Sequence, residues 1–113
     1  RRVSQISHQL KTLARVCDVP VIALSQLNRN VESRADRTPQ LADLRQSGSL
    51  EQDADQVLLL FRYDYYVGQG VFDEDLARKN TCDVIVGKHR NGATGRYTLR
   101  FQPETMSFKE FSR

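Results

Sequence analysis

The feature that most constrains the fold is a pair of patterned segments separated by a short turn. Residues 82–87 have the pattern of a buried strand, and residues 96–101 alternate polar and apolar side chains as a half-exposed strand does. Asn91-Gly92 lies between them, and this dipeptide favours the positive backbone angles of a tight hairpin turn. The sequence therefore predicts an antiparallel hairpin with residues 88–95 at its tip.

The tip of this hairpin carries two cations, Lys88 and Arg90. Because they are two residues apart in an extended segment, we expect both side chains on the same face. A rigid turn that holds a lysine and an arginine can contact an anionic group, such as a phosphate, on another molecule. A solvated basic turn without a ligand has the same pattern, and spacing alone does not decide between the two interpretations.

The composition is that of a single globular domain. The chain has 113 residues, of which 39% are hydrophobic and 27% are charged. Its net charge of +3 permits a polyanionic partner without requiring one. No apolar run approaches the ~20 residues that cross a membrane. The first residue is arginine and no secretory signal opens the chain, so we expect a piece of a longer, cytoplasmic protein.

Cysteine and histidine are sparse in this sequence. Cys17 and Cys82 lie in unrelated segments, and we interpret them as two buried thiols in a reducing compartment. His8 and His89 are equally scattered, so the chain has no metal-ligand spacing. We therefore expect no metal site built from these residues.

The first part of the chain has the pattern of a helix followed by a strand. Apolar side chains recur at helical spacing between residues 6 and 17, with Ser4 as a candidate N-cap and Val19-Pro20 ending the helix. Residues 21–24 form an apolar run rich in β-branched side chains, typical of a central strand in a parallel sheet covered on both faces. A helix joined to such a strand is an α/β unit.

A long polar loop follows this strand and extends to about residue 48. Gln26 stands at the C-terminal end of the strand, where open α/β sheets bind ligands. Its amide can sense a phosphate or orient water, and it can equally cap its own loop. Residues 45–49 place an arginine and small residues before a helix start, which suits a phosphate, although a plain connector has the same composition.

Three carboxylates, those of Glu51, Asp53 and Asp55, lie close together in the sequence. Paired carboxylates can perform acid–base or metal chemistry, but a solvated end of a short helix at 49–54 is the favoured interpretation. Asp55 then leads into a buried strand at 57–61.

Residues 62–80 form a polar connection that contains three tyrosines. These rings can stack on nucleic-acid bases, but we favour the interpretation that they pack together and anchor the loop.

No P-loop is present, because the glycine segments at 68–70 and 92–95 lack the following Lys-Ser/Thr. No predicted strand ends in a carboxylate suited to hold magnesium. If the protein performs nucleotide chemistry, this chain supplies only part of the site.

Three segments in this order resemble one protein family. They are Ser25-Gln26-Leu27-Asn28-Arg29, Asp43-Leu44-Arg45-Gln46-Ser47-Gly48-Ser49-Leu50-Glu51-Gln52-Asp53-Ala54-Asp55 and Lys88-His89-Arg90-Asn91-Gly92-Ala93-Thr94-Gly95. Together they resemble the C-terminal half of the RecA-like motor domain of DnaB-type replicative helicases. The helix before Pro20 fits the same family, so the resemblance spans nearly the whole chain.

The resemblance implies an α/β fold. It implies a partial RecA-like (P-loop NTPase) core, with a mostly parallel sheet, a C-terminal β-hairpin, and the Walker A and B half missing. Residues 1–113 then correspond to the C-terminal portion of a helicase ATPase domain. An isolated piece of this kind is expected to be inactive.

The resemblance also implies roles at the nucleotide site. In this family a ring-shaped hexamer couples ATP hydrolysis to translocation along single-stranded DNA. Gln26 corresponds to the glutamine that senses the γ-phosphate and links the nucleotide site to the DNA contacts. Lys88 and Arg90 correspond to the basic pair that reaches the ATP bound by the neighbouring subunit, with Arg90 as the arginine finger.

A DNA-binding loop that lines the central channel corresponds to Arg45, Gln46 and Gly48. Family members usually carry Glu at the position of Gln46. The connection at 62–80 is somewhat long for the family, so its contacts are the least transferable.

The implied function is that of an ATP-dependent replicative DNA helicase in a bacterium or phage. Its cofactor is ATP with Mg²⁺, whose main ligands lie outside residues 1–113. The implied partners are single-stranded DNA, further copies in a hexameric ring and other replication proteins, with no membrane. Two alternatives stay open: a RecA-family recombination or repair ATPase, and a non-enzymatic nucleic-acid-binding module.

Overall fold

The structure is a computed structural model that describes residues 2–44 and 47–111. Its helices are α1 (Arg2–Cys17), α2 (Ser47–Asp53) and α3 (Tyr63–Gly68). Its strands are β1 (Gln56–Phe61), β2 (Thr81–His89), β3 (Gly95–Gln102) and β4 (Ser107–Glu110). Short 3₁₀ helices occupy Arg29–Ser33, Leu41–Asp43 and Leu76–Arg78.

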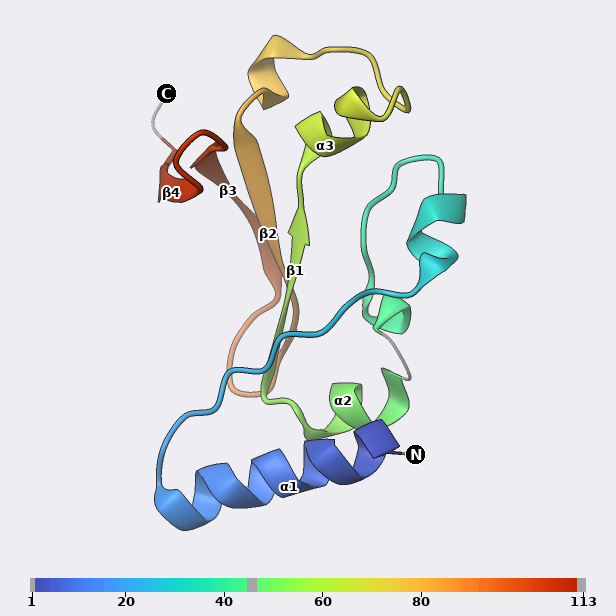
Figure 1. The fold of residues 1–113 in the computed structure, drawn as a ribbon. Coiled ribbons are helices and arrows are strands. Elements are labelled where there is room, and N and C mark those ends of the chain that lie inside the picture. The colour runs from blue at the N-terminus through green and yellow to red at the C-terminus, as the bar shows by residue number, and fades with distance from the viewer. Residues whose placement is uncertain (1, 45–46, 112–113) are drawn as a thin grey trace.

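One four-stranded sheet forms the body of the structure, in the order β1-β2-β3-β4 (Figure 1). The predicted hairpin is confirmed as β2 and β3, which pair antiparallel with Cys82 opposite Leu99 and Ile85 opposite Arg96. The α/β class is also confirmed. The predicted mostly parallel sheet is wrong for the described residues, because β1 and β4 also pair antiparallel with their neighbours.

The strand predicted at residues 21–24 does not form in the described chain. The segment is without regular structure, and the side chains of Ile22 and Leu24 are 90% and 96% exposed. A strand needs a neighbouring backbone to satisfy its N–H and C=O groups. No strand within residues 2–44 and 47–111 pairs with this segment. Its nearest pairing is an isolated antiparallel bridge between Leu27 and Leu44.

Helix α1 ends through a recognisable backbone motif. Asp18 adopts the left-handed conformation (φ 54°), and the N–H of Val19 donates to the carbonyl of Ala14 at 3.1 Å. This is the 6→1 bond of a Schellman motif, and it closes the helix before Pro20 as predicted. The prediction of Ser4 as N-cap is wrong, because the helix already begins at Arg2.

The core lies between one face of β1 and the short helices beneath it. Leu44, Val57 and Leu59 are buried there; partly buried neighbours pack around them, namely Leu27, Leu41, Leu50, Ala54 and Ile85. Strand β1 alternates, so that Leu58 and Leu60 remain more than half exposed on its other face. The prediction of a buried strand at residues 57–61 therefore holds for one of its two faces in the described structure.

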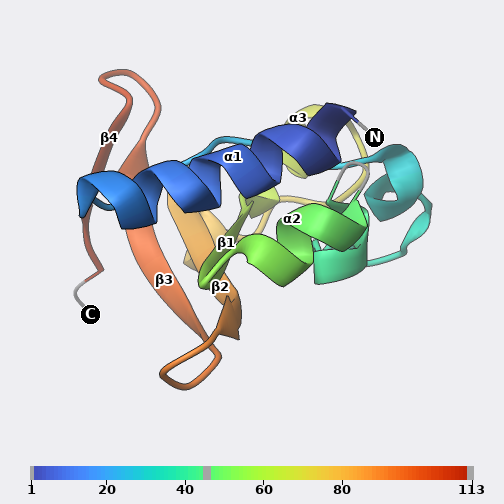
Figure 2. The ribbon, with the colours of Figure 1, turned by 90° about the horizontal axis from the view of Figure 1, so that it is seen from below.

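Helix α1 lies alongside α2 (Figure 2), at one end of the sheet rather than on its face (Figure 1). The hydroxyl of Ser7 donates to the carboxylate of Asp53 at 2.6 Å, which joins the two helices. Cys82 is buried as predicted, whereas Cys17 is exposed at the end of α1, so its interpretation as a buried thiol is wrong.

The connection at residues 62–80 is packed by its own aromatic side chains. The rings of Tyr63 and Phe72 stack at 4.8 Å, and those of Phe61 and Tyr66 at 5.9 Å. The hydroxyl of Tyr63 donates to the carbonyl of Asp73 at 2.8 Å. These contacts favour the interpretation of the tyrosines as a loop anchor.

Candidate functional site: the basic hairpin tip

The turn between β2 and β3 spans residues 90–94 and is longer than the two-residue turn that Asn91-Gly92 favours. Neither Asn91 nor Gly92 has a positive φ angle, so that part of the prediction is wrong. Longer hairpin loops are commonly built around ordinary right-handed turns. Gly92 is needed for another reason: a Cβ atom there would lie 2.4 Å from the His89 ring.

Lys88 and Arg90 reach the same acceptor, which confirms that they lie on one face. The ammonium group of Lys88 donates to the carbonyl of Gln52 at 3.2 Å and also to the carbonyl of Glu51. The Nη2 atom of Arg90 donates to the carbonyl of Gln52 at 2.9 Å. These carbonyls lie near the C-terminal end of α2, where a helix carries partial negative charge and favours cations.

Asp55 is the second anchor of the tip. Its Oδ1 atom lies 2.9 Å from Nη1 of Arg90 and 2.7 Å from Nζ of Lys11 on α1. The hydrogen bond from Lys11, together with the positive charges of Lys11, Arg90 and Lys88, lowers the pKa of this carboxyl. Asp55 is therefore ionised at neutral pH and ties the hairpin to α1.

The other two acidic residues of this region make different contacts. Asp53 accepts the hydrogen bond from Ser7 and lies 3.0 Å from Nδ1 of His8. Glu51 contributes its backbone carbonyl to Lys88. No three His, Cys, Asp or Glu side chains are grouped to hold a metal ion within residues 2–44 and 47–111. The acidic segment thus cross-links α2 to its surroundings, which favours a structural interpretation.

Gln26 lies exposed in the irregular segment that follows α1. The next residue, Leu27, bridges Leu44, and the N–H of Asn28 donates to the carbonyl of Asp43 at 2.6 Å. These bonds bring the segment of Gln26 to the residue directly before the predicted DNA-binding loop.

Two of the predicted loop residues, Arg45 and Gln46, lie outside the described residues. The third, Gly48, is the second residue of α2. The same short helix therefore follows the predicted loop at one end and binds the hairpin cations at the other.

A buried ion pair that the sequence did not indicate shapes the loop between Gln26 and α2. Asp43 is fully buried, and its two carboxylate oxygens accept hydrogen bonds from both Nη atoms of Arg34 at 2.6 Å. The backbone N–H of Gln40 adds a third bond at 2.7 Å. The hydrogen bond from Arg34 lowers the pKa of Asp43 and raises that of Arg34. Nothing in the spacing of Arg34 and Asp43 in the sequence indicates that they pair.

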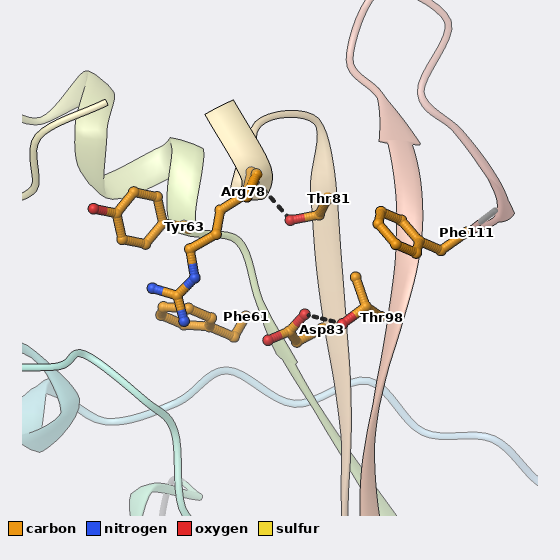
Figure 3. Close-up of a pocket in the computed structure, with 8 residues that line it drawn as sticks. Phe61, Tyr63, Arg78, Thr81, Asp83, Thr98 and Phe111 are labelled. Carbon is orange, nitrogen blue, oxygen red and sulfur yellow. Dashed lines mark hydrogen bonds between the residues drawn. The ribbon is translucent and has the colours of Figure 1, made fainter. Parts of the chain in front are cut away.

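An open cavity of about 230 Å³ lies beside β2 and β3 at the opposite end of the sheet (Figure 3). The guanidinium of Arg78 stacks 4.6 Å from the Tyr63 ring. Asp83 in the cavity wall accepts from the hydroxyl of Thr98 at 2.9 Å and from Arg96 at 2.7 Å. These polar groups of the cavity wall thus bind one another.

The fold described above also occurs in solved structures. One of them, described as an ATPase domain, superposes with a TM-score of 0.87 at 49% identity, covering 97% of this chain and 37% of that chain. A second solved structure has the same TM-score and identity and covers 97% of this chain and 25% of that chain. It is described as "The Structure Of A DnaB-Like Replicative Helicase And Its Interactions With Primase". The fold is thus that of a helicase ATPase domain.

The amino-acid sequence identifies the family. Residues 1–110 match the family described as "DnaB-like helicase C terminal domain", and the chain belongs to it. It is 47% identical to "Replicative DNA helicase DnaC" of Bacillus subtilis and 48% identical to "Replicative DNA helicase DnaB" of Geobacillus stearothermophilus, in both cases over all 113 residues. The chain spans 24% of the length of each of these relatives. Among the described helices, none has the length and apolar character needed to span a membrane.

Proposed function

We propose that the whole protein is an ATP-dependent replicative DNA helicase and that residues 1–113 are the C-terminal portion of its ATPase domain. Family membership and relatives that are named as replicative helicases support this function. The observation that carries the proposal is the tip of the β2–β3 hairpin, where two cations share one face and the Arg90 side chain keeps 44% of its surface exposed.

Arg90 acts as an arginine finger on ATP·Mg²⁺ bound by the neighbouring subunit, and Lys88 supports it. Phosphoryl transfer spreads negative charge over the phosphate oxygens, so an arginine supplied by another subunit stabilises the transition state. A planar guanidinium suits this task because it offers several N–H donors in one plane. The main ligands of ATP and Mg²⁺ belong to other parts of the protein, because this sequence has no P-loop.

Gln26 senses the γ-phosphate and links it to DNA. The bridge between Leu27 and Leu44 supports this role, since it joins the segment of Gln26 to the loop that contains Arg45, Gln46 and Gly48. We assign that loop to single-stranded DNA in the channel of a hexameric ring. Because one similar structure is named for its interactions with primase, we also propose partners among the replication proteins.

A forked duplex tests the proposed function directly. The full-length protein with ATP, Mg²⁺ and a fork that carries a single-stranded tail is expected to displace the duplex strand. Residues 1–113 alone are expected to show neither displacement nor ATP hydrolysis, which serves as the comparison. DNA-dependent hydrolysis without displacement would instead indicate a recombination or repair ATPase. Nucleic-acid binding without any hydrolysis would indicate a non-enzymatic module.

Replacing Arg45 with alanine in the full-length protein is expected to weaken binding of single-stranded DNA. If Arg45 neutralises one phosphate, the slope of log K against log [salt] becomes shallower by about one unit. Fluorescence titration at several salt concentrations measures the slope. Arg15→Ala on the exposed face of α1 removes the same charge and is expected to leave the slope unchanged. An unaltered slope in the Arg45 variant rules out the phosphate contact.

A further inference from the structure

Asp55 contacts Arg90 in two separate ways. Its carbonyl oxygen accepts the backbone N–H of Arg90 at 2.8 Å, and its Oδ1 accepts from Nη1 of the guanidinium at 2.9 Å. One residue therefore fixes both the start and the end of a long, flexible side chain. A side chain of this length otherwise has considerable rotamer freedom.

The contacts leave part of the guanidinium available. A guanidinium has five N–H donors. Two of its nitrogen atoms donate within the chain, Nη1 to Asp55 and Nη2 to the carbonyl of Gln52. The side chain still keeps 44% of its surface exposed, so the remaining N–H groups can face a ligand held by another molecule.

The carboxylate of Asp55 is itself held in place. Lys11, on α1, binds the same Oδ1 atom at 2.7 Å and is two-thirds shielded from solvent. The position of Arg90 is thus defined by three elements: the hairpin, the segment after α2, and α1.

We propose that Asp55 is a positioning residue that holds the Arg90 guanidinium at the angle needed to meet the nucleotide of the neighbouring subunit. This inference rests on the proposed role of Arg90. Asp55 touches neither nucleotide nor DNA and acts only through Arg90. Because a misplacement of about 1 Å can lower a rate by about 100-fold, an exposed ion pair can matter for turnover while adding little to stability.

The test uses the assembled full-length protein with saturating single-stranded DNA. Asp55→Ala is expected to lower kcat for ATP hydrolysis by about 10- to 100-fold, with the Kd for ATP changed by less than about threefold. Asp55→Asn keeps an oxygen that can accept from Arg90 and is expected to recover part of the loss. A large loss of ATP binding, or no change in kcat, would overturn the proposal.

Asp83→Ala is the matched control, because it breaks another aspartate–arginine pair on the same hairpin, with Arg96. It is expected to change kcat by less than about twofold. An equal loss in this variant would show that a loosened hairpin explains the effect, which overturns the positioning role.

A double-mutant cycle separates this inference from the proposed function. Adding Asp55→Ala to Arg90→Ala is expected to cause no further loss, because residues that act through one another are not additive. A further loss in the double variant would overturn the inference. Normal turnover in Arg90→Ala alone would refute the proposed function itself, whereas a defective Arg90→Ala with an active Asp55→Ala would refute only the positioning role.

Discussion

Replacing Arg90 with alanine in the full-length protein is expected to reduce DNA-stimulated ATP hydrolysis by about 10³- to 10⁵-fold. The loss is large because the transition state carries more charge on the transferred phosphate than bound ATP does, and the arginine counters that extra charge. Binding of ATP is expected to be nearly unchanged, since we assign its main ligands to other parts of the protein. Steady-state hydrolysis at saturating DNA and equilibrium titration with a fluorescent ATP analogue measure the two quantities.

Arg96→Ala provides the control for this experiment. Arg96 is the second residue of β3 on the same hairpin, and its side chain pairs with Asp83 at 2.7 Å rather than with the anchors of Arg90. Its loss removes the same charge and is expected to change hydrolysis by only a few-fold. Sedimentation should show the same oligomeric state for both variants. An Arg90 variant that assembles normally but no longer binds ATP would contradict the finger role.

The hairpin could be predicted from sequence because its determinants are local. Alternation in residues 96–101, the buried pattern of residues 82–87 and the Asn91-Gly92 dipeptide all act within a few residues of one another. These features define the direction of the strands and which side chains share a face. They do not define the length of the turn, which spans residues 90–94 in the structure.

The parallel sheet could not be predicted correctly from the same kind of pattern. The apolar run at residues 21–24 indicates a segment that is suited to burial, but it carries no information about which backbone pairs with it. In the described residues no strand pairs with it, and its side chains are exposed. The same holds for strand β1. Its outer face is apolar, which is typical of a face that another layer covers, but residues 2–44 and 47–111 place no layer over it.

The groups that hold Arg90 in place also could not be predicted from the sequence. The resemblance to a family indicated Arg90, but the acceptors of its guanidinium lie 35 and 38 residues earlier, at Asp55 and Gln52. One acceptor is a backbone carbonyl, which leaves no trace in residue type. Pairings of this kind depend on how α2 packs against the hairpin, so they emerge only from the folded chain.

Replacing Asp43 with asparagine is expected to destabilise the loop between residues 28 and 44 by about 3 kcal/mol. Removing one partner of a buried ion pair leaves the other charge uncompensated, at a cost of about 3–5 kcal/mol. The lower value is expected here because the side chain of Arg34 keeps 25% of its surface in contact with solvent. Hydrogen exchange of the full-length protein should report this as about 100-fold faster exchange at the Asn28 amide, which donates to the carbonyl of Asp43.

Asp36→Asn is the matched control in the same loop, because this exposed aspartate accepts only a local hydrogen bond from the Thr38 amide among the described contacts. Its effect is expected to stay within about 0.5 kcal/mol. Equal exchange rates in the Asp43 variant and the unmodified protein would show that the Arg34 pair does not hold the loop.

The same ion pair predicts a pH dependence whose sign follows from linkage. Folding lowers the pKa of Asp43 below its usual 3.8, chiefly through the hydrogen bond from Arg34. Its contribution is therefore complete above about pH 4 and is lost as the pH falls through the lowered pKa of the folded state. Protection of the Asn28 amide, corrected for intrinsic exchange, should stay constant from neutral pH to about pH 5 and decline below about pH 4. The Asp43→Asn variant lacks the titrating group, so its protection should not show this component of the decline. A decline of equal size in both proteins would assign the acid sensitivity to other carboxylates.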